Sequence, residues 1–119
     1  MFPSGMAMKA YATAAAARDP GAQEAEVFHQ VTALLRQASR GDARARRRAL
    51  LDNRLLWSTV IDLLHDTDNA LPPQLRAAII SVGLAVQREN ARDEPDFRFL
   101  IDVNENIAAG LARSGGARP

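Results

Sequence analysis

The sequence has no cysteine, few aromatic residues and no long apolar run. Without cysteine, the chain has neither a disulfide framework nor thiolate chemistry. Aromatic residues make up only 5% of the chain, so the core must be built mainly from Leu, Ile, Val and Ala. No apolar run approaches the ~20 residues of a transmembrane helix, and the residues after Lys9 lack the Leu-rich stretch of a signal peptide. These absences fit a cytoplasmic protein without a membrane partner.

The composition favours a single helical domain. The 119 residues are enough for one domain with a modest core. Strand-forming residues are few, whereas Ala and Arg are abundant, which favours helix. The net charge is only +1, but arginines crowd the region 36–54 and acidic residues the region 93–105. A basic region on a nearly neutral domain suits nucleic acid, an acidic protein partner or simple solvation.

Apolar spacing and helix-breaking residues predict four main helices, over about 23–39, 43–65, 72–90 and 96–113. Gly41 ends the first, and Asp42 is a suitable N-cap for the second. Pro72 and Pro73 open the third, where a missing N–H costs nothing. Because short loops between helices favour antiparallel neighbours, we expect an all-α fold, a small bundle of four main helices.

A shorter helix is expected before this bundle. The segment Met8–Ala17 is rich in Ala and carries Tyr11 as its one large side chain. It is too short to be stable alone, so it must dock on another surface or fray. We therefore expect a disordered leader over 1–7, one helical domain over 8–113 and a disordered tail over 114–119.

Residue patterns typical of catalysis are missing. His29 and His65 fall on different predicted helices, without the cysteines or spaced carboxylates of a metal site. Ser58 and Ser81 lie within helices, away from any strand-to-helix nucleophile turn. The isolated glycines form no phosphate-binding loop. We expect no enzymatic activity, no metal and no cofactor.

Two asparagines interrupt apolar helix faces. Asn53 falls on the stripe of Trp57, and Asn104 on the apolar face of the last helix. An unpaired buried amide costs about 1–3 kcal/mol, so these side chains either bond helix ends or loop backbone and set the register of the bundle, or they face a partner helix. Arg54 either clamps a carboxylate, such as Asp62 or one of the last helix, or serves a functional contact.

The stretch from Asn53 to Leu84 carries more apolar surface than one bundle core needs. We expect this stretch to bind a partner together with one aromatic residue of the Ala-rich segment and one of the helix predicted over 23–39. The candidate partner-binding residues are Tyr11, Phe28, Arg54, Leu55, Leu56, Trp57, Ile61, Ile80 and Leu84.

The run Arg44–Arg48 is the candidate for RNA binding. Its charges spread around more than half of a helix, whereas a phosphate-tracking face would form one stripe, and no aromatic residue interleaves to stack bases. A solvated helix start and a secondary RNA contact both stay open.

The chain resembles the FlaF family of flagellar biosynthesis proteins over about residues 8–111. The blocks that carry the resemblance occur in the family's order and spacing: Lys9–Tyr11, Glu26–Thr32, Asn53–Trp57, Asn69–Pro72, Leu75–Ser81 and Leu100–Asn104. The leader Met1–Gly5 and the heavy basic run depart from the pattern.

The resemblance implies a cytoplasmic chaperone dedicated to flagellin, working beside the regulator FlbT, with no enzymatic activity or cofactor. Combined with the excess apolar surface, it predicts that an amphipathic flagellin helix binds in a groove. The alternatives are control of flagellin synthesis, through FlbT or flagellin messenger RNA, and homo-oligomerisation through the same surface.

Overall fold

The structure, a computed structural model, describes residues 20–116, which form four helices and no strand. The expected all-α fold with four main helices is confirmed. The predicted leader, the Ala-rich helix over Met8–Ala17 and Tyr11 lie outside the described residues. The helices are α2 (Pro20–Ser39), α3 (Ala43–His65), α4 (Pro73–Asn90) and α5 (Phe97–Gly116).

Local signals mark the starts of α3, α4 and α5. The Asp42 side chain accepts a hydrogen bond from the Ala45 N–H at 2.8 Å and begins α3 as predicted. Asp96 does the same for α5, accepting from the Phe99 N–H at 3.1 Å. α4 begins at Pro73 and ends at Asn90, also as predicted.

Two helix ends differ from the prediction. α2 begins at Pro20 rather than near Gln23. Proline is tolerated in the first turn of a helix, because the N–H groups there have no partner within the helix. α5 runs on to Gly116, so its last turn includes Ser114–Gly116, which we assigned to the tail.

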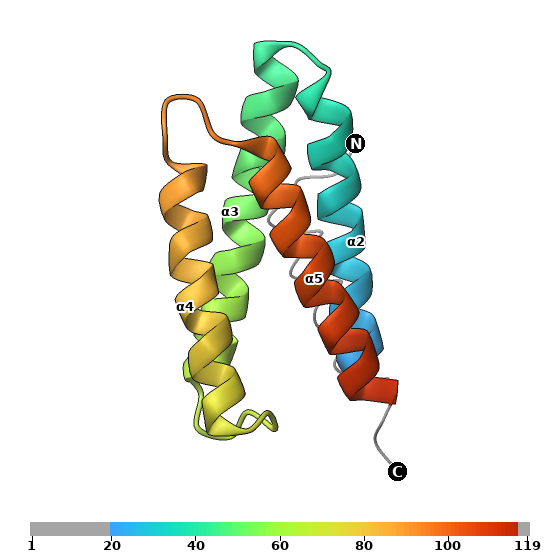
Figure 1. The fold of residues 1–119 in the computed structure, drawn as a ribbon, viewed down its shortest axis with the longest axis vertical. Helices are drawn as coiled ribbons and strands as arrows, with labels where there is room; N and C mark the ends of the chain where they lie inside the picture. The colour runs from blue at the N-terminus through green and yellow to red at the C-terminus, as the bar shows by residue number, and fades with distance from the viewer. Residues whose placement is uncertain (1–19, 117–119) are drawn as a thin grey trace.

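The four helices form a ring in the order α2, α3, α4, α5. Figure 1 shows α3 beside α4, with α5 crossing α2 at an angle. α2 packs most extensively against α5, α3 packs against both α2 and α4, and α4 only just reaches α5. The backbones of α3 and α5 make no close contact. Side chains must therefore fill the space between these two diagonal helices.

A relay of buried hydrogen bonds spans this diagonal. The Trp57 indole N–H donates to Asn104 Oδ1 at 2.9 Å, and Asn104 Nδ2 donates to Asn53 Oδ1 at 2.8 Å. Asn53 Nδ2 then donates to Asn90 Oδ1 at 3.0 Å, and Asn90 Nδ2 to the Leu50 carbonyl at 2.7 Å. Both asparagines are hydrogen-bonded within the bundle: Asn53 bonds Asn90 at the end of α4, and Asn104 bonds Asn53 and Trp57 rather than loop backbone. That they set the register stays a prediction.

Trp57 also fixes how closely α4 approaches α3. Its ring meets that of Phe28 edge-on, with centroids 5.4 Å apart and planes at 79°. A Cβ at Gly83 would lie 2.9 Å from both Trp57 Cε3 and Ile61 Cδ1. A glycine in the middle of α4 is therefore required by the close approach of these side chains.

We expect Asn104→Ala to lower the free energy of unfolding by about 2–5 kcal/mol, because it leaves the Trp57 N–H and Asn53 Oδ1 buried without partners. Chemical denaturation measures this loss. Asn106→Ala, an exposed asparagine on the same helix, should change stability by about 0.5 kcal/mol or less. Equal effects of the two substitutions would show that the relay is not needed for stability.

We expect Gly83→Ala to destabilise the bundle by up to about 2 kcal/mol. Its gain in helix propensity, about 1 kcal/mol, is smaller than the cost of overpacking against the rigid Trp57 ring, about 1–3 kcal/mol. Gly110→Ala in α5 is the matched control, because a Cβ there meets nothing within 4 Å. Thermal or chemical denaturation should show that Gly83→Ala lowers the stability and that Gly110→Ala raises it. A stabilising Gly83→Ala would contradict the packing argument.

Candidate functional site

The predicted partner-binding residues fall into three groups. Phe28, Leu56 and Trp57 are core residues with at most 4% of their surface exposed, so a partner reaches them only by displacing a helix. Tyr11 lies outside the described residues. The others reach the surface at least in part: Leu55, Ile61 and Ile80 are half-buried, and Arg54 and Leu84 are exposed.

A hydrogen-bonded contact shows which sides of α3 and α4 adjoin. Gln87 Nε2 donates to the Ser58 hydroxyl at 3.1 Å and to the Arg54 carbonyl at 3.0 Å. Ile80 and Leu84 precede Gln87 by seven and three residues, so they share its face of α4. Leu55 precedes Ser58 by three residues and shares its face of α3. These apolar side chains therefore lie on one side of the α3–α4 pair.

Leu51 belongs to the same surface and is missing from the predicted set. It is 49% exposed and lies one turn before Leu55. The spacing of Leu51, Leu55 and Ser58 is the signal that could have identified it. We call the surface formed by Leu51, Arg54, Leu55, Ile80 and Leu84 the outer α3–α4 face.

Arg54 does not form the expected clamp. Among residues 20–116, the ion pairs join Arg36 to Glu105, Arg92 to Glu89 and Arg98 to Asp102. The prediction that Arg54 holds Asp62 or a carboxylate of α5 is therefore wrong for the described residues. The reason is geometric, because α5 lies diagonally across the bundle from α3 while Arg54 is on the outside.

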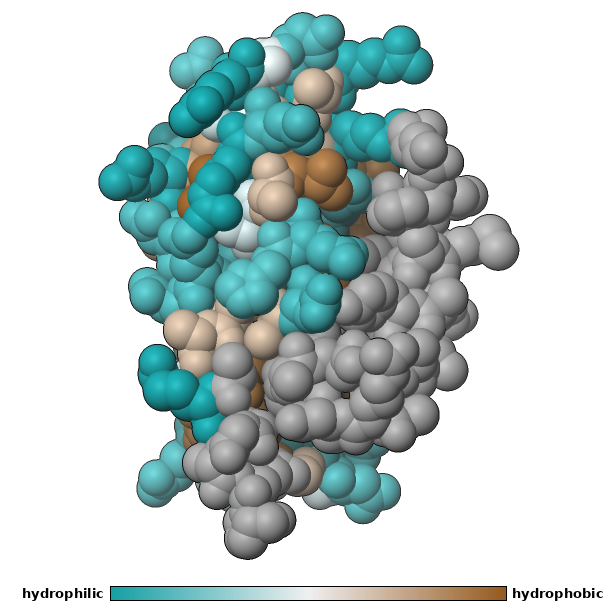
Figure 2. All heavy atoms as spheres, turned by 90° about the vertical axis from the view of Figure 1, so that its right-hand side faces the viewer, coloured by the Kyte–Doolittle hydropathy of each residue, from teal (hydrophilic) through white to brown (hydrophobic). Residues whose placement is uncertain are grey.

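The basic run at the start of α3 is divided by the fold. The Arg46 guanidinium lies over the Phe97 ring, 5.0 Å from its centroid, at the junction with α5. Arg44, Arg47 and Arg48 are exposed at the end of the bundle that carries the α2–α3 turn. That end, at the top of Figure 2, is covered mainly by hydrophilic side chains. Arg46 is exposed as well but lies toward Phe97, so Arg44, Arg47 and Arg48 form a narrower basic stripe than we predicted.

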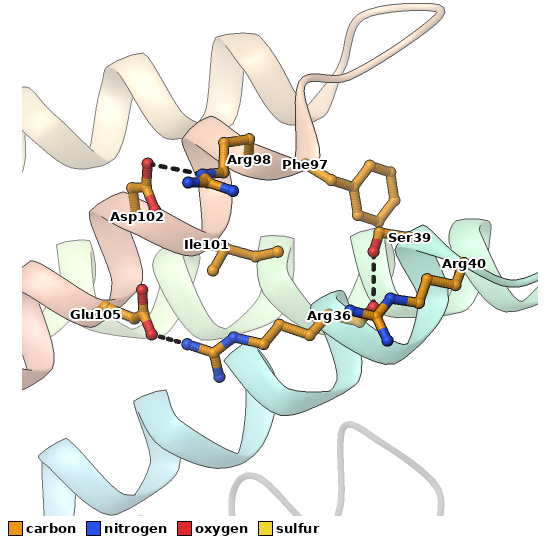
Figure 3. Close-up of a pocket in the computed structure, with 8 residues that line it drawn as sticks. All are labelled: Arg36, Ser39, Arg40, Phe97, Arg98, Ile101, Asp102 and Glu105. Carbon is orange, nitrogen blue, oxygen red and sulfur yellow. Dashed lines mark hydrogen bonds and ion pairs between the residues drawn. The ribbon is translucent and has the colours of Figure 1, made fainter.

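A hollow lies between the end of α2 and the start of α5. Figure 3 shows Arg36 reaching from α2 to Glu105 of α5, while Arg98 pairs with Asp102 at 3.5 Å. Its charges are largely neutralised within the protein, so the hollow is less suited to a charged ligand than the stripe on α3.

Residues 20–116 contain neither a metal-type cluster nor a membrane-spanning helix. Within residues 20–116 no three His, Cys, Asp or Glu side chains gather in a way that could hold a metal ion. No helix in the same range combines the length and apolarity needed to cross a membrane.

Comparison with known proteins identifies one family. The family model described as flagellar protein FlaF matches residues 7–111, nearly the whole chain. No curated protein and no solved structure shows a significant match. The matched region contains all four described helices except the last turn of α5, together with the relay and the outer α3–α4 face. The chain belongs to the FlaF family of flagellar proteins.

Proposed function

We propose that this protein is a non-enzymatic, cytoplasmic chaperone that binds flagellin and supports its export and assembly into the flagellum. The observation that carries the proposal is the outer α3–α4 face, where apolar side chains from two adjacent helices lie together outside the core. Leu51 and Leu84 are each about half exposed, at 49% and 50%. Family membership supplies the flagellar context.

The proposed binding mode is an amphipathic flagellin helix laid along α3 and α4. Two antiparallel helices leave a shallow groove along their line of contact, and an apolar helix face buries its side chains there. Phe28, Leu56 and Trp57 contribute indirectly in this account, because they hold α3 and α4 in place from within the core. Leu51, Leu55, Ile80 and Leu84 make the apolar contact.

The distribution of charge along α3 predicts which way round the flagellin helix lies. Arg44, Arg48, Leu51 and Leu55 follow one another at spacings of four, three and four residues, so they share one face of α3. The face is basic near the α2–α3 turn and apolar toward the middle of the helix. A partner helix with acidic residues at one end and apolar residues beyond them would match it.

We expect the protein to co-purify with full-length flagellin and to lose binding when the flagellin terminus that supplies the helix is removed. Comparing full-length flagellin with versions truncated at either end tests this in dilute buffer. Binding to none of the three would sink the chaperone proposal.

We expect Leu84→Asp to weaken flagellin binding at least tenfold, about 1.4 kcal/mol, because a carboxylate would be buried against an apolar helix. Titration calorimetry measures the change. Leu75→Asp is the matched control: Leu75 is also exposed on α4 (40%), but nine residues place it on the opposite side of the helix. Unchanged affinity in Leu84→Asp, or equal losses in both, would contradict the assigned face. Light scattering of the unchanged protein detects self-association through the same face.

A second candidate function is control of flagellin synthesis, through FlbT or flagellin messenger RNA. The observation that favours it is the stripe of Arg44, Arg47 and Arg48, which is narrower than the sequence suggests once Arg46 packs on Phe97. Arginines on one exposed face suit phosphate or an acidic protein surface.

Salt dependence separates the two candidates. If RNA binds through the stripe, affinity should fall steeply as salt rises, by about 0.7 log units per phosphate contact and log unit of salt. Replacing Arg44, Arg47 and Arg48 by Gln should abolish RNA binding, whereas Arg113→Gln should leave RNA binding intact. Binding assays with flagellin messenger RNA and with FlbT over a salt series test this. Flagellin binding that is nearly insensitive to salt, with no RNA or FlbT binding, would rule out the second candidate.

A further inference from the structure

A separate hollow lies beside the start of α3, because α4 is the shorter of these two adjacent helices. Asn90, the last residue of α4, donates a hydrogen bond to the Leu50 carbonyl at 2.7 Å. The turns of α3 that precede Leu50 therefore extend beyond α4, and the loop over residues 91–96 leads from α4 to α5 at this end of the bundle (Figure 1). The space between the loop and the start of α3, which we call the end hollow, has a volume of about 730 Å³.

The two walls of the end hollow carry opposite charges. Arg46 and Arg47 line the wall formed by α3, and Asp93 and Glu94 line the wall formed by the loop. All four side chains are exposed, and none forms an ion pair with another of residues 20–116. Two cations and two anions therefore border one hollow without a counterion in the described part of the chain.

Local contacts hold both walls in place. The Glu89 carboxylate accepts a hydrogen bond from the Asp96 N–H at 2.8 Å and pairs with Arg92 at 3.2 Å, which ties the loop to the end of α4. On the other wall, the Arg46 guanidinium lies over the Phe97 ring. A partner therefore meets walls that are already ordered, which lowers the conformational entropy that binding costs.

The floor of the end hollow is apolar. Phe97 lines it and is 7% exposed, and Leu50 and Pro95 line it and are half-buried. Ion pairs between exposed groups contribute little affinity one by one. Burial of this floor can add affinity, while the charges select the partner and its orientation.

The charge pattern limits which partner fits. A purely anionic surface would match Arg46 and Arg47 but would be repelled by Asp93 and Glu94, and a purely cationic surface would meet the opposite problem. A partner that covers the hollow must carry both signs side by side. A second copy of this chain meets that condition. A two-fold rotation about an axis through the hollow places the acidic wall of each copy opposite the basic wall of the other.

We propose that two copies of this protein associate through their end hollows as a two-fold symmetric dimer. The basic wall of each copy pairs with the acidic wall of the other, and the two apolar floors face each other. None of the residues of the outer α3–α4 face lines the end hollow. Each copy therefore keeps that face, and the dimer does not depend on flagellin binding.

Sedimentation equilibrium of the unchanged protein without any partner tests the association first. We expect a monomer–dimer equilibrium over a concentration series. A protein that stays monomeric up to about 1 mM would overturn the proposal.

Reversing the charge of one wall at a time tests the interface itself. Arg46→Glu with Arg47→Glu makes both walls acidic, and Asp93→Arg with Glu94→Arg makes both walls basic. Each double variant alone should dimerise at least tenfold more weakly than the unchanged protein, because like charges then meet. An equal mixture of the two should form a heterodimer, because every acidic wall again meets a basic one. Unweakened dimers of either variant alone, or a mixture that stays monomeric, would overturn the proposal.

Three control variants carry changes outside the end hollow. Arg88→Glu and Asp62→Arg reverse exposed charges on α4 and α3, and Leu84→Asp alters the outer α3–α4 face. All three should dimerise like the unchanged protein. Loss of the dimer in Leu84→Asp would place self-association on the outer α3–α4 face, and equal losses in the charge controls would reduce the effect to net charge. Either result would overturn the assigned interface.

Discussion

The hydrogen bonds that run from Trp57 through Asn104 and Asn53 to Asn90 hold the bundle in one arrangement. They cross the space between α3 and α5, whose backbones do not meet, and continue to the last residue of α4. Each donor in the relay finds its acceptor on another helix. A slip of one turn in α3, α4 or α5 would leave several polar groups buried without partners, at about 1–3 kcal/mol each. Apolar contacts alone would tolerate such slips more easily.

The arrangement that the relay holds also determines the surface. Trp57 fills the centre of the bundle, and Gly83 lets α4 close on the Trp57 ring and on Ile61. That close approach brings Gln87 within hydrogen-bonding distance of Ser58, and with it places Leu84 and Leu55 on the same side. In this account the core residues of the central stretch support the proposed flagellin contact, while their neighbours on the outside make it.

Much of the fold could be predicted from local signals. Asp42, Pro72 and Pro73 mark helix starts through capping and proline chemistry, which depend only on nearby residues. The burial of individual apolar residues was harder, because Leu55 and Leu56 are the same residue type and differ only in which flank of α3 meets a neighbouring helix. The asparagines stood out on apolar stripes, but the pairing of Asn53 with Asn104, 51 residues apart, requires the tertiary structure. The stacking of Arg46 on Phe97 likewise requires the tertiary structure, because it depends on how α3 and α5 pack.

The central claim is that flagellin binds the outer α3–α4 face, and leucine methyl NMR of the protein with and without flagellin tests it most directly. The account predicts that the methyl signals of Leu51, Leu55 and Leu84 shift or broaden on binding, while those of Leu34 and Leu75, exposed apolar residues outside the face, stay in place. Changes centred on Leu34 or Leu75, with Leu51, Leu55 and Leu84 unaffected, would contradict it.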